Sequence, residues 1–93
     1  MTIGLLTLDL LIHGARSLKD KRRVVKSLKD RIRNRYNASV AEVDFLDEWR
    51  RARLAVCVVA RESRFANTQL NEIGRYAATC SEAEVTNIAI EML

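Results

Sequence analysis

The chain has 93 residues and a formal net charge of +4, and 48% of its residues are hydrophobic and 30% charged. These proportions are typical of a soluble globular protein with one domain and a modest core. The apolar segment 3–12 is short and carries an acidic residue, which excludes a membrane span or a signal sequence, so we expect a cytoplasmic protein.

Residues 1–12 alternate in a way that predicts a β-strand. Every second residue of Leu6–Ile12 would lie on one face and form a row of the core. The opposite face, Leu5–Leu11, is mixed and includes Asp9, so we expect it to be partly exposed or covered by a partner chain. The turn His13–Arg16 then leads into a helix.

Ser17–Tyr36 predicts an amphipathic α-helix. Ser17 is a natural N-cap, and Asp20 gives a weak capping box and suits the positive end of the helix dipole. Lys21 falls on the apolar stripe, where we expect its stem to follow the edge of the core with the ammonium group in solvent. The stripe recurs at helical spacing and comprises Leu18, Val25, Leu28, Ile32 and Tyr36, with Val24 on its flank.

The polar face of this helix is strongly basic. Arg16–Arg35 contains ten Lys or Arg and two Asp, a local charge of +8, so the rest of the chain sums to −4. Six of these cations define the basic ridge: Lys19, Arg22, Arg23, Lys26, Lys29 and Arg33.

Two interpretations of the basic ridge stay open. It is either a solvated face, kept for solubility or neutralised by the chain's own acids, or a surface that neutralises the phosphates of a nucleic acid. A membrane-surface helix is disfavoured, because the apolar stripe is narrow and the core needs it.

The rest of the chain predicts three strands and a second helix. Residues 38–44 form a strand, and a charged loop follows at 45–51. Residues 52–61 are an almost continuous apolar and β-branched run, which predicts a central strand buried on much of both faces. Ser63 would cap a helix that extends to Cys80, and residues 84–92 would close the chain as a strand.

The element order is therefore strand, helix, strand, strand, helix, strand. Two right-handed βαβ crossovers, with the middle strands joined as a hairpin, place both helices on one face of a four-stranded antiparallel sheet. We predict an α+β protein with the ferredoxin-like βαββαβ sandwich, formed by residues 1–93 as a single domain.

Three segments resemble one protein family. Residues 17–22, residues 37–43 and Trp49–Ala52 are similar to signatures of the small bacterial YlxP-like proteins, a domain of unknown function, and the resemblance spans nearly the whole chain. It implies a ferredoxin-like fold. Because such proteins are often encoded near translation and transcription-factor genes, it also implies an RNA- or ribosome-associated role. It implies no catalytic residues, since none are established for the family.

The strands argue against one familiar mode of RNA binding. RNA-recognition domains share this fold and stack bases on aromatic residues of the first and third strands, but residues 3–12 and 52–61 contain no Phe, Tyr or Trp. We therefore expect mostly phosphate contacts from the basic ridge, with low sequence selectivity. Trp49, Arg50 and Arg51 are further candidate partner contacts, unless Trp49 folds back over the sheet edge.

Other chemistry has weaker support. Gly14, Arg16 and Ser17 form a candidate anion site at a helix N-terminus, and acylphosphatases hold phosphate at this position of the same fold, but one glycine and one arginine make a poor cradle. No cofactor or metal is expected, because the only histidine has no Cys or acidic neighbour at ligand spacing. Cys57 and Cys80 are expected to be buried thiols.

Glu42 and Asp44 would share a strand face, and we expect salt bridges to the basic helix or to a second subunit rather than a two-carboxylate site. The sequence favours a small non-catalytic binding protein that contacts RNA or the ribosome. One alternative is a structural or regulatory module that dimerises through Leu5, Leu11 and Val59 without binding nucleic acid. A weaker one is an acylphosphatase-like hydrolase.

Overall fold

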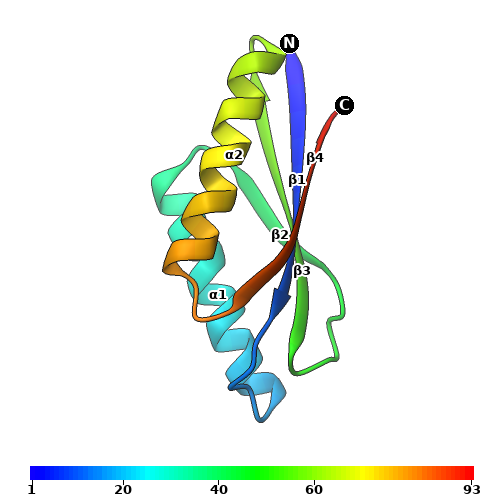
Figure 1. Ribbon diagram of the computed structural model, residues 1–93, viewed down its shortest axis with the longest axis vertical. Helices are drawn as coiled ribbons and strands as arrows, with labels where there is room; N and C mark the ends of the chain where they lie inside the picture. Colours follow the sequence, from blue (N-terminus) through cyan, green and yellow to red (C-terminus); the bar gives the residue numbers. More distant parts are fainter.

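The computed structural model describes residues 1–93. Its elements are β1 (Thr2–Leu11), α1 (Leu18–Arg35), β2 (Ser39–Asp44), β3 (Arg51–Ala60), α2 (Ser63–Cys80) and β4 (Glu84–Met92). The strands pair antiparallel in the order β2-β3-β1-β4, and both helices lie on the same side of the sheet (Figure 1). The predicted ferredoxin-like α+β sandwich is confirmed.

The core lies between the sheet and the helices. Leu6 and Leu8 of β1 are fully buried, and they face the helices beside Val56 and Leu54 of β3, with which they pair. The alternate residues of β3, Arg53–Cys57, remain partly exposed. The expectation that this strand is buried on much of both faces was therefore wrong, because both helices cover one face and leave the other open (Figure 1).

A β-bulge changes the pattern of β4. The register between β1 and β4 shifts at Thr86, so that Val85 pairs with Leu10 while Ile88 pairs with Leu8. Strict alternation would place Val85 and Ile88 on opposite faces, but one extra residue puts both on the helix side.

The helix starts follow the predicted chemistry in part. The Ser17 hydroxyl caps α1 by accepting a hydrogen bond from the Asp20 amide at 3.1 Å. The Asp20 carboxylate reaches back to the Arg16 amide at 3.0 Å rather than to the Ser17 amide. In α2 the N-cap is Glu62, with no side-chain cap, and Ser63 is the first helical residue. Neither helix combines the length and apolar character needed to cross a membrane.

Candidate nucleic-acid interface

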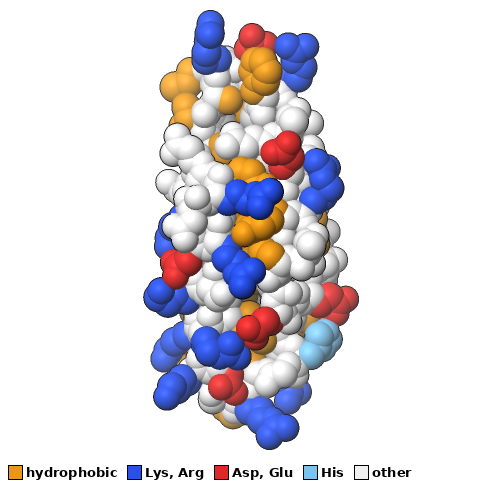
Figure 2. Space-filling model, turned by 90° about the vertical axis from the view of Figure 1, so that its left-hand side faces the viewer, with side chains coloured by type: hydrophobic (Ala, Val, Ile, Leu, Met, Phe, Trp, Pro, Cys, Tyr) orange, Lys and Arg blue, Asp and Glu red, His pale blue; other side chains and the backbone are white.

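The basic ridge lies on the solvent side of α1. The helix buries Val24, Val25 and Leu28 against the core, so the side chains about half a turn away point outward. Five of the six ridge residues are exposed and Lys29 is half-exposed. The view onto the helix layer shows Lys and Arg side chains distributed over most of its length (Figure 2).

Three ridge residues have partners within the chain. Lys26 Nζ lies 2.7 Å from Asp30 Oδ2, and Arg33 Nη2 donates to the Val40 carbonyl at 2.6 Å. Arg23 Nη1 lies 3.3 Å from Glu82 Oε1. The hydrogen bond from Lys26 holds the pKa of Asp30 below its ordinary value. The ion pairs of Lys26 and Arg23 are solvent-exposed and therefore weak, but they neutralise part of the ridge. The Val40 carbonyl engages Arg33 without neutralising its charge.

The other three ridge residues are Lys19, Arg22 and Lys29, and none of them forms an ion pair in the structure. They lie within about 80° of one another around α1 at 100° per residue. A cationic strip of this kind is available to an anionic ligand, because no ion pair within the chain has to be broken first. Half of the ridge residues are therefore engaged by other groups of the chain, and the other half form no ion pair.

Lys21 corrects one prediction. Its side chain is 1% exposed, and its ammonium group lies 2.7 Å from Glu42 Oε2. It also donates to the carbonyls of Phe45, at 2.5 Å, and Leu46, at 3.4 Å. The expected exposed ammonium group was wrong, because β2 presents a carboxylate on the helix side and the following loop turns two carbonyls toward α1. The contact with Glu42 Oε2 is ionic and lacks hydrogen-bond geometry.

Glu42 and Asp44 do not share a face. The β2–β3 register shifts between them, which leaves Glu42 on the helix side and puts Asp44 on the open side, 3.3 Å from Arg53. The expected salt bridge from β2 to the basic helix is present at Glu42. The expectation of two carboxylates on one strand face was wrong, because a bulge reverses the alternation.

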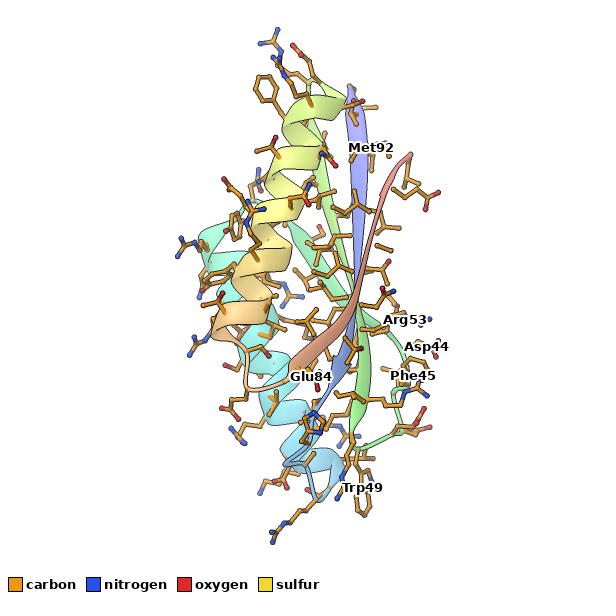
Figure 3. All side chains as sticks on the ribbon, viewed as in Figure 1. Asp44, Phe45, Trp49, Arg53, Glu84 and Met92 are labelled. Atoms are coloured by element: carbon orange, nitrogen blue, oxygen red, sulfur yellow. The ribbon has the colours of Figure 1, made fainter.

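The loop after β2 carries the other candidate contacts. Trp49 is 51% exposed and lies at the loop tip, away from Phe45 (Figure 3). Arg50 donates to the Ala15 carbonyl at 3.2 Å, and the Arg51 guanidinium stacks over the Phe45 ring at 3.7 Å. Within this candidate set, Trp49 is therefore the side chain left available to a partner.

The candidate anion site is largely occupied by the chain itself. The Arg16 amide and the Ser17 hydroxyl are both used in capping α1. The charged residues that line the small cavity beside Gly14, about 100 Å³, are Asp20, Arg23 and Glu82, and Arg23 pairs with Glu82. Two acidic groups against one arginine that is already paired disfavour a bound anion, so this arrangement gives no support to the acylphosphatase-like alternative.

The open face of the sheet carries one well-formed ion pair. Arg53 Nε donates to Asp9 Oδ1 at 2.6 Å. This hydrogen bond lowers the pKa of Asp9 despite the opposing effect of burial, and it raises the pKa of Arg53. The pair fixes the end of the open face that lies nearest the β2–β3 loop.

Replacing Asp9 with Asn should remove an acid-sensitive part of the stability. A folded-state pKa below the unfolded value of about 3.9 stabilises the protein above that value, and the stabilisation is lost as pH falls through the folded pKa. We expect the difference in unfolding free energy between wild type and Asp9→Asn to be constant from pH 7 to 5 and to shrink below about pH 4. Urea unfolding across this range measures it, and a difference unchanged at pH 2.5 would contradict the assignment.

The structure brings no metal site together. No group of three or more His, Cys, Asp or Glu side chains is placed to hold an ion, and His13 pairs with Glu84 at 2.7 Å. Cys57 and Cys80 are free thiols, but both are half-buried rather than buried as expected. Cys57 lies on the open face of the sheet, and Cys80 is the last residue of α2 and packs against the edge of the core.

The sequence did not reveal a second group of candidate side chains, which lies in the groove between the helices. Arg35 and Tyr36 at the end of α1 meet Arg75 and Tyr76 of α2 there. The sequence predicts only the position of each of these residues along its own helix. Their proximity depends on the packing of α1 against α2, which no local pattern specifies.

Comparison with known proteins identifies the family to which the chain is similar. A family model, DUF503, described as a protein of unknown function, matches residues 3–90. The uncharacterized protein YlxP of Bacillus subtilis (strain 168) is 29% identical over 84 residues, 90% of this chain and 91% of that protein. The solution NMR structure of a de novo designed protein with a ferredoxin fold aligns with 100% of this chain and 83% of its own, at 17% identity and a TM-score of 0.43. The family resemblance seen in the sequence motifs is confirmed.

Proposed function

This chain belongs to the DUF503 family, and from its structure we propose that it is a non-catalytic binding protein that associates with RNA through the basic ridge of α1. The partner in this proposal is cytoplasmic RNA, either free or on the ribosome. The ridge contacts phosphate oxygens, and it reads little sequence because it approaches the backbone of the RNA rather than the base edges.

One observation carries the proposal: the cationic strip of Lys19, Arg22 and Lys29 has no acidic partner although the rest of the chain is net acidic. If the ridge served only as a counter-charge for the chain's own acids, it would be paired along its whole length. Its unpaired part faces solvent along one flank of a rigid, capped helix.

A salt titration of binding to a ribosomal RNA fragment tests the proposal. Each phosphate contact contributes about −0.7 to −0.9 to the slope of log K against log salt concentration. Three contacts therefore predict a slope near −2 to −3. Negligible binding at low salt, or binding whose affinity does not depend on salt, would contradict the proposal.

A second candidate function is assembly through the open face of the sheet. Val59 is 67% exposed there, and Leu5, Leu11 and Cys57 are partly exposed beside it. Aliphatic side chains on an uncovered sheet face are suited to packing against a second copy. Such a dimer is compatible with RNA binding, because the ridge lies on the opposite layer.

Light scattering at micromolar concentration tests this assembly. We expect twice the monomer mass for the wild-type protein and the monomer mass for Val59→Arg, because a buried unpaired guanidinium opposes sheet-on-sheet packing. Val59 is exposed within one chain, so the fold should tolerate the change. A wild-type protein that is strictly monomeric would contradict the candidate.

A further inference from the structure

A surface groove of about 500 Å³ runs between the end of α1 and the C-terminal half of α2. Its lining residues are Arg35, Tyr36, Glu72, Arg75, Tyr76, Thr79 and Cys80. The view onto the helix layer shows hydrophobic side chains exposed along its middle, with Lys and Arg directly beside them (Figure 2). An apolar floor with cationic walls suits a ligand that is planar and carries negative charge nearby.

The aromatic part of the groove is rigid. The rings of Tyr36 and Tyr76 pack edge to face, with centroids 5.8 Å apart and an interplanar angle of 69°. Both tyrosines are half-buried and pack against the core, so they lose little freedom when a ligand binds. Neither tyrosine hydroxyl has a hydrogen-bond partner within the chain.

Arg35 completes a stacking platform. Its guanidinium carbon lies 4.7 Å from the centroid of Tyr76 and 6.0 Å from that of Tyr36. The side chain of Arg35 is exposed, so the guanidinium group over the Tyr76 ring is accessible from solvent. Unstacked nucleic acid bases stack on aromatic rings and on arginine planes of this kind.

The charges around the platform are unneutralised. Arg35 and Arg75 form no ion pair, and Arg31 donates only to the Cys80 carbonyl at 3.5 Å. Glu72 is the single carboxylate that lines the groove. Arg31 lies beside the groove, through its bond to Cys80, and lines a neighbouring surface depression with Arg23, Lys26 and Asp30. Cationic side chains therefore continue from the edge of the groove to the basic ridge.

We propose that this groove binds an unstacked base of single-stranded RNA, with the base on the Arg35–Tyr76 platform and the flanking phosphates on Arg31 and Arg75. The inference rests on the proposed function and adds to it a stacking contact that the sheet face lacks. Stacking tolerates any base, so selectivity for sequence stays low while selectivity for unpaired RNA is gained.

The test compares Tyr76→Leu with Tyr76→Phe on a single-stranded RNA oligonucleotide that carries one 2-aminopurine. Leucine keeps an apolar side chain over the core but has no ring, whereas phenylalanine keeps the ring. We expect Tyr76→Leu to weaken binding about tenfold, to leave the salt slope unchanged, and to abolish the fluorescence change of the 2-aminopurine. Tyr76→Phe should behave like the wild type, and the thermal midpoints of both variants verify that the fold is intact.

Each outcome decides a separate claim. Wild-type binding that Tyr76→Leu leaves unchanged would overturn the stacking site and leave phosphate binding by the ridge standing. No binding by the wild type at low salt would overturn both. Equal competition by polyglutamate, with the same dependence on Tyr76, would mean that the groove binds an acidic peptide, and would overturn the assignment to RNA.

Discussion

Replacing Lys21 with methionine is expected to lower the free energy of unfolding by about 3–5 kcal/mol, the usual cost of removing one partner from a buried ion pair. The methionine fills most of the volume of the lysine stem, so the loss comes from the charge. Glu42, whose side chain is 14% exposed, would retain a carboxylate without its counter-ion. The carbonyls of Phe45 and Leu46 would lose the ammonium donor that they share. Urea unfolding at pH 7, followed by circular dichroism, measures the effect.

The double variant Lys21→Met/Glu42→Leu is the matched control. Replacing both members of a buried ion pair with apolar residues is often neutral or stabilising, so this protein should recover most of the loss. A deficit of about 1–2 kcal/mol should remain, because the loop carbonyls still lack a donor. If the free energy of unfolding of Lys21→Met lies within about 0.5 kcal/mol of the wild-type value, the ion pair is not buried as described.

The Lys21 contacts also fix a strained loop. Phe45 has a φ of 61°, in the left-handed region that costs a non-glycine residue about 1–2 kcal/mol. The Lys21 ammonium group donates to the carbonyl of Phe45, and the guanidinium of Arg51 stacks on its ring. The start of the helix that carries the basic ridge and the loop that carries Trp49 are therefore joined by one buried side chain.

The fold was predictable because its signals are local. Period-two alternation in β1, the cap at Ser17 and the helical stripe of α1 each depend on residues within a few positions of one another, and all agree with a single topology. The ridge was equally readable, since residues at i, i+4 and i+7 share a face of any helix. The sequence therefore predicts well those features that depend on residues within a single helix or strand.

The features that were mispredicted or missed depend on contacts between elements. Lys21 is buried only because Glu42 and the carbonyl of Phe45 meet it from another part of the chain. The bulges that reorient Asp44 and Val85 come from strand pairing, which a one-residue slip changes without altering local propensity. The same holds for the interhelical groove, whose two tyrosines are forty residues apart in sequence.

Replacing Lys19, Arg22 and Lys29 together with glutamine is expected to weaken RNA binding about 100-fold at 0.1 M salt. Each phosphate contact to a single strand contributes about 0.7 to the salt slope, which corresponds to about fivefold in affinity at this salt concentration. The slope itself should fall by about 2. Binding isotherms from 0.05 to 0.3 M salt, recorded on the ribosomal RNA fragment, give both quantities, and glutamine keeps the length and helix propensity of the replaced side chains.

The control is the triple variant Arg23→Gln/Lys26→Gln/Arg33→Gln, which removes the same net charge from the same helix. These three side chains already bind Glu82, Asp30 and the Val40 carbonyl, so we expect them to supply fewer phosphate contacts and this variant to lose clearly less affinity. Equal losses would mean that RNA responds to net charge rather than to the unpaired strip. If neither variant loses affinity while both remain folded, the RNA contacts another surface, and the unpaired strip on α1 is only a solvated face.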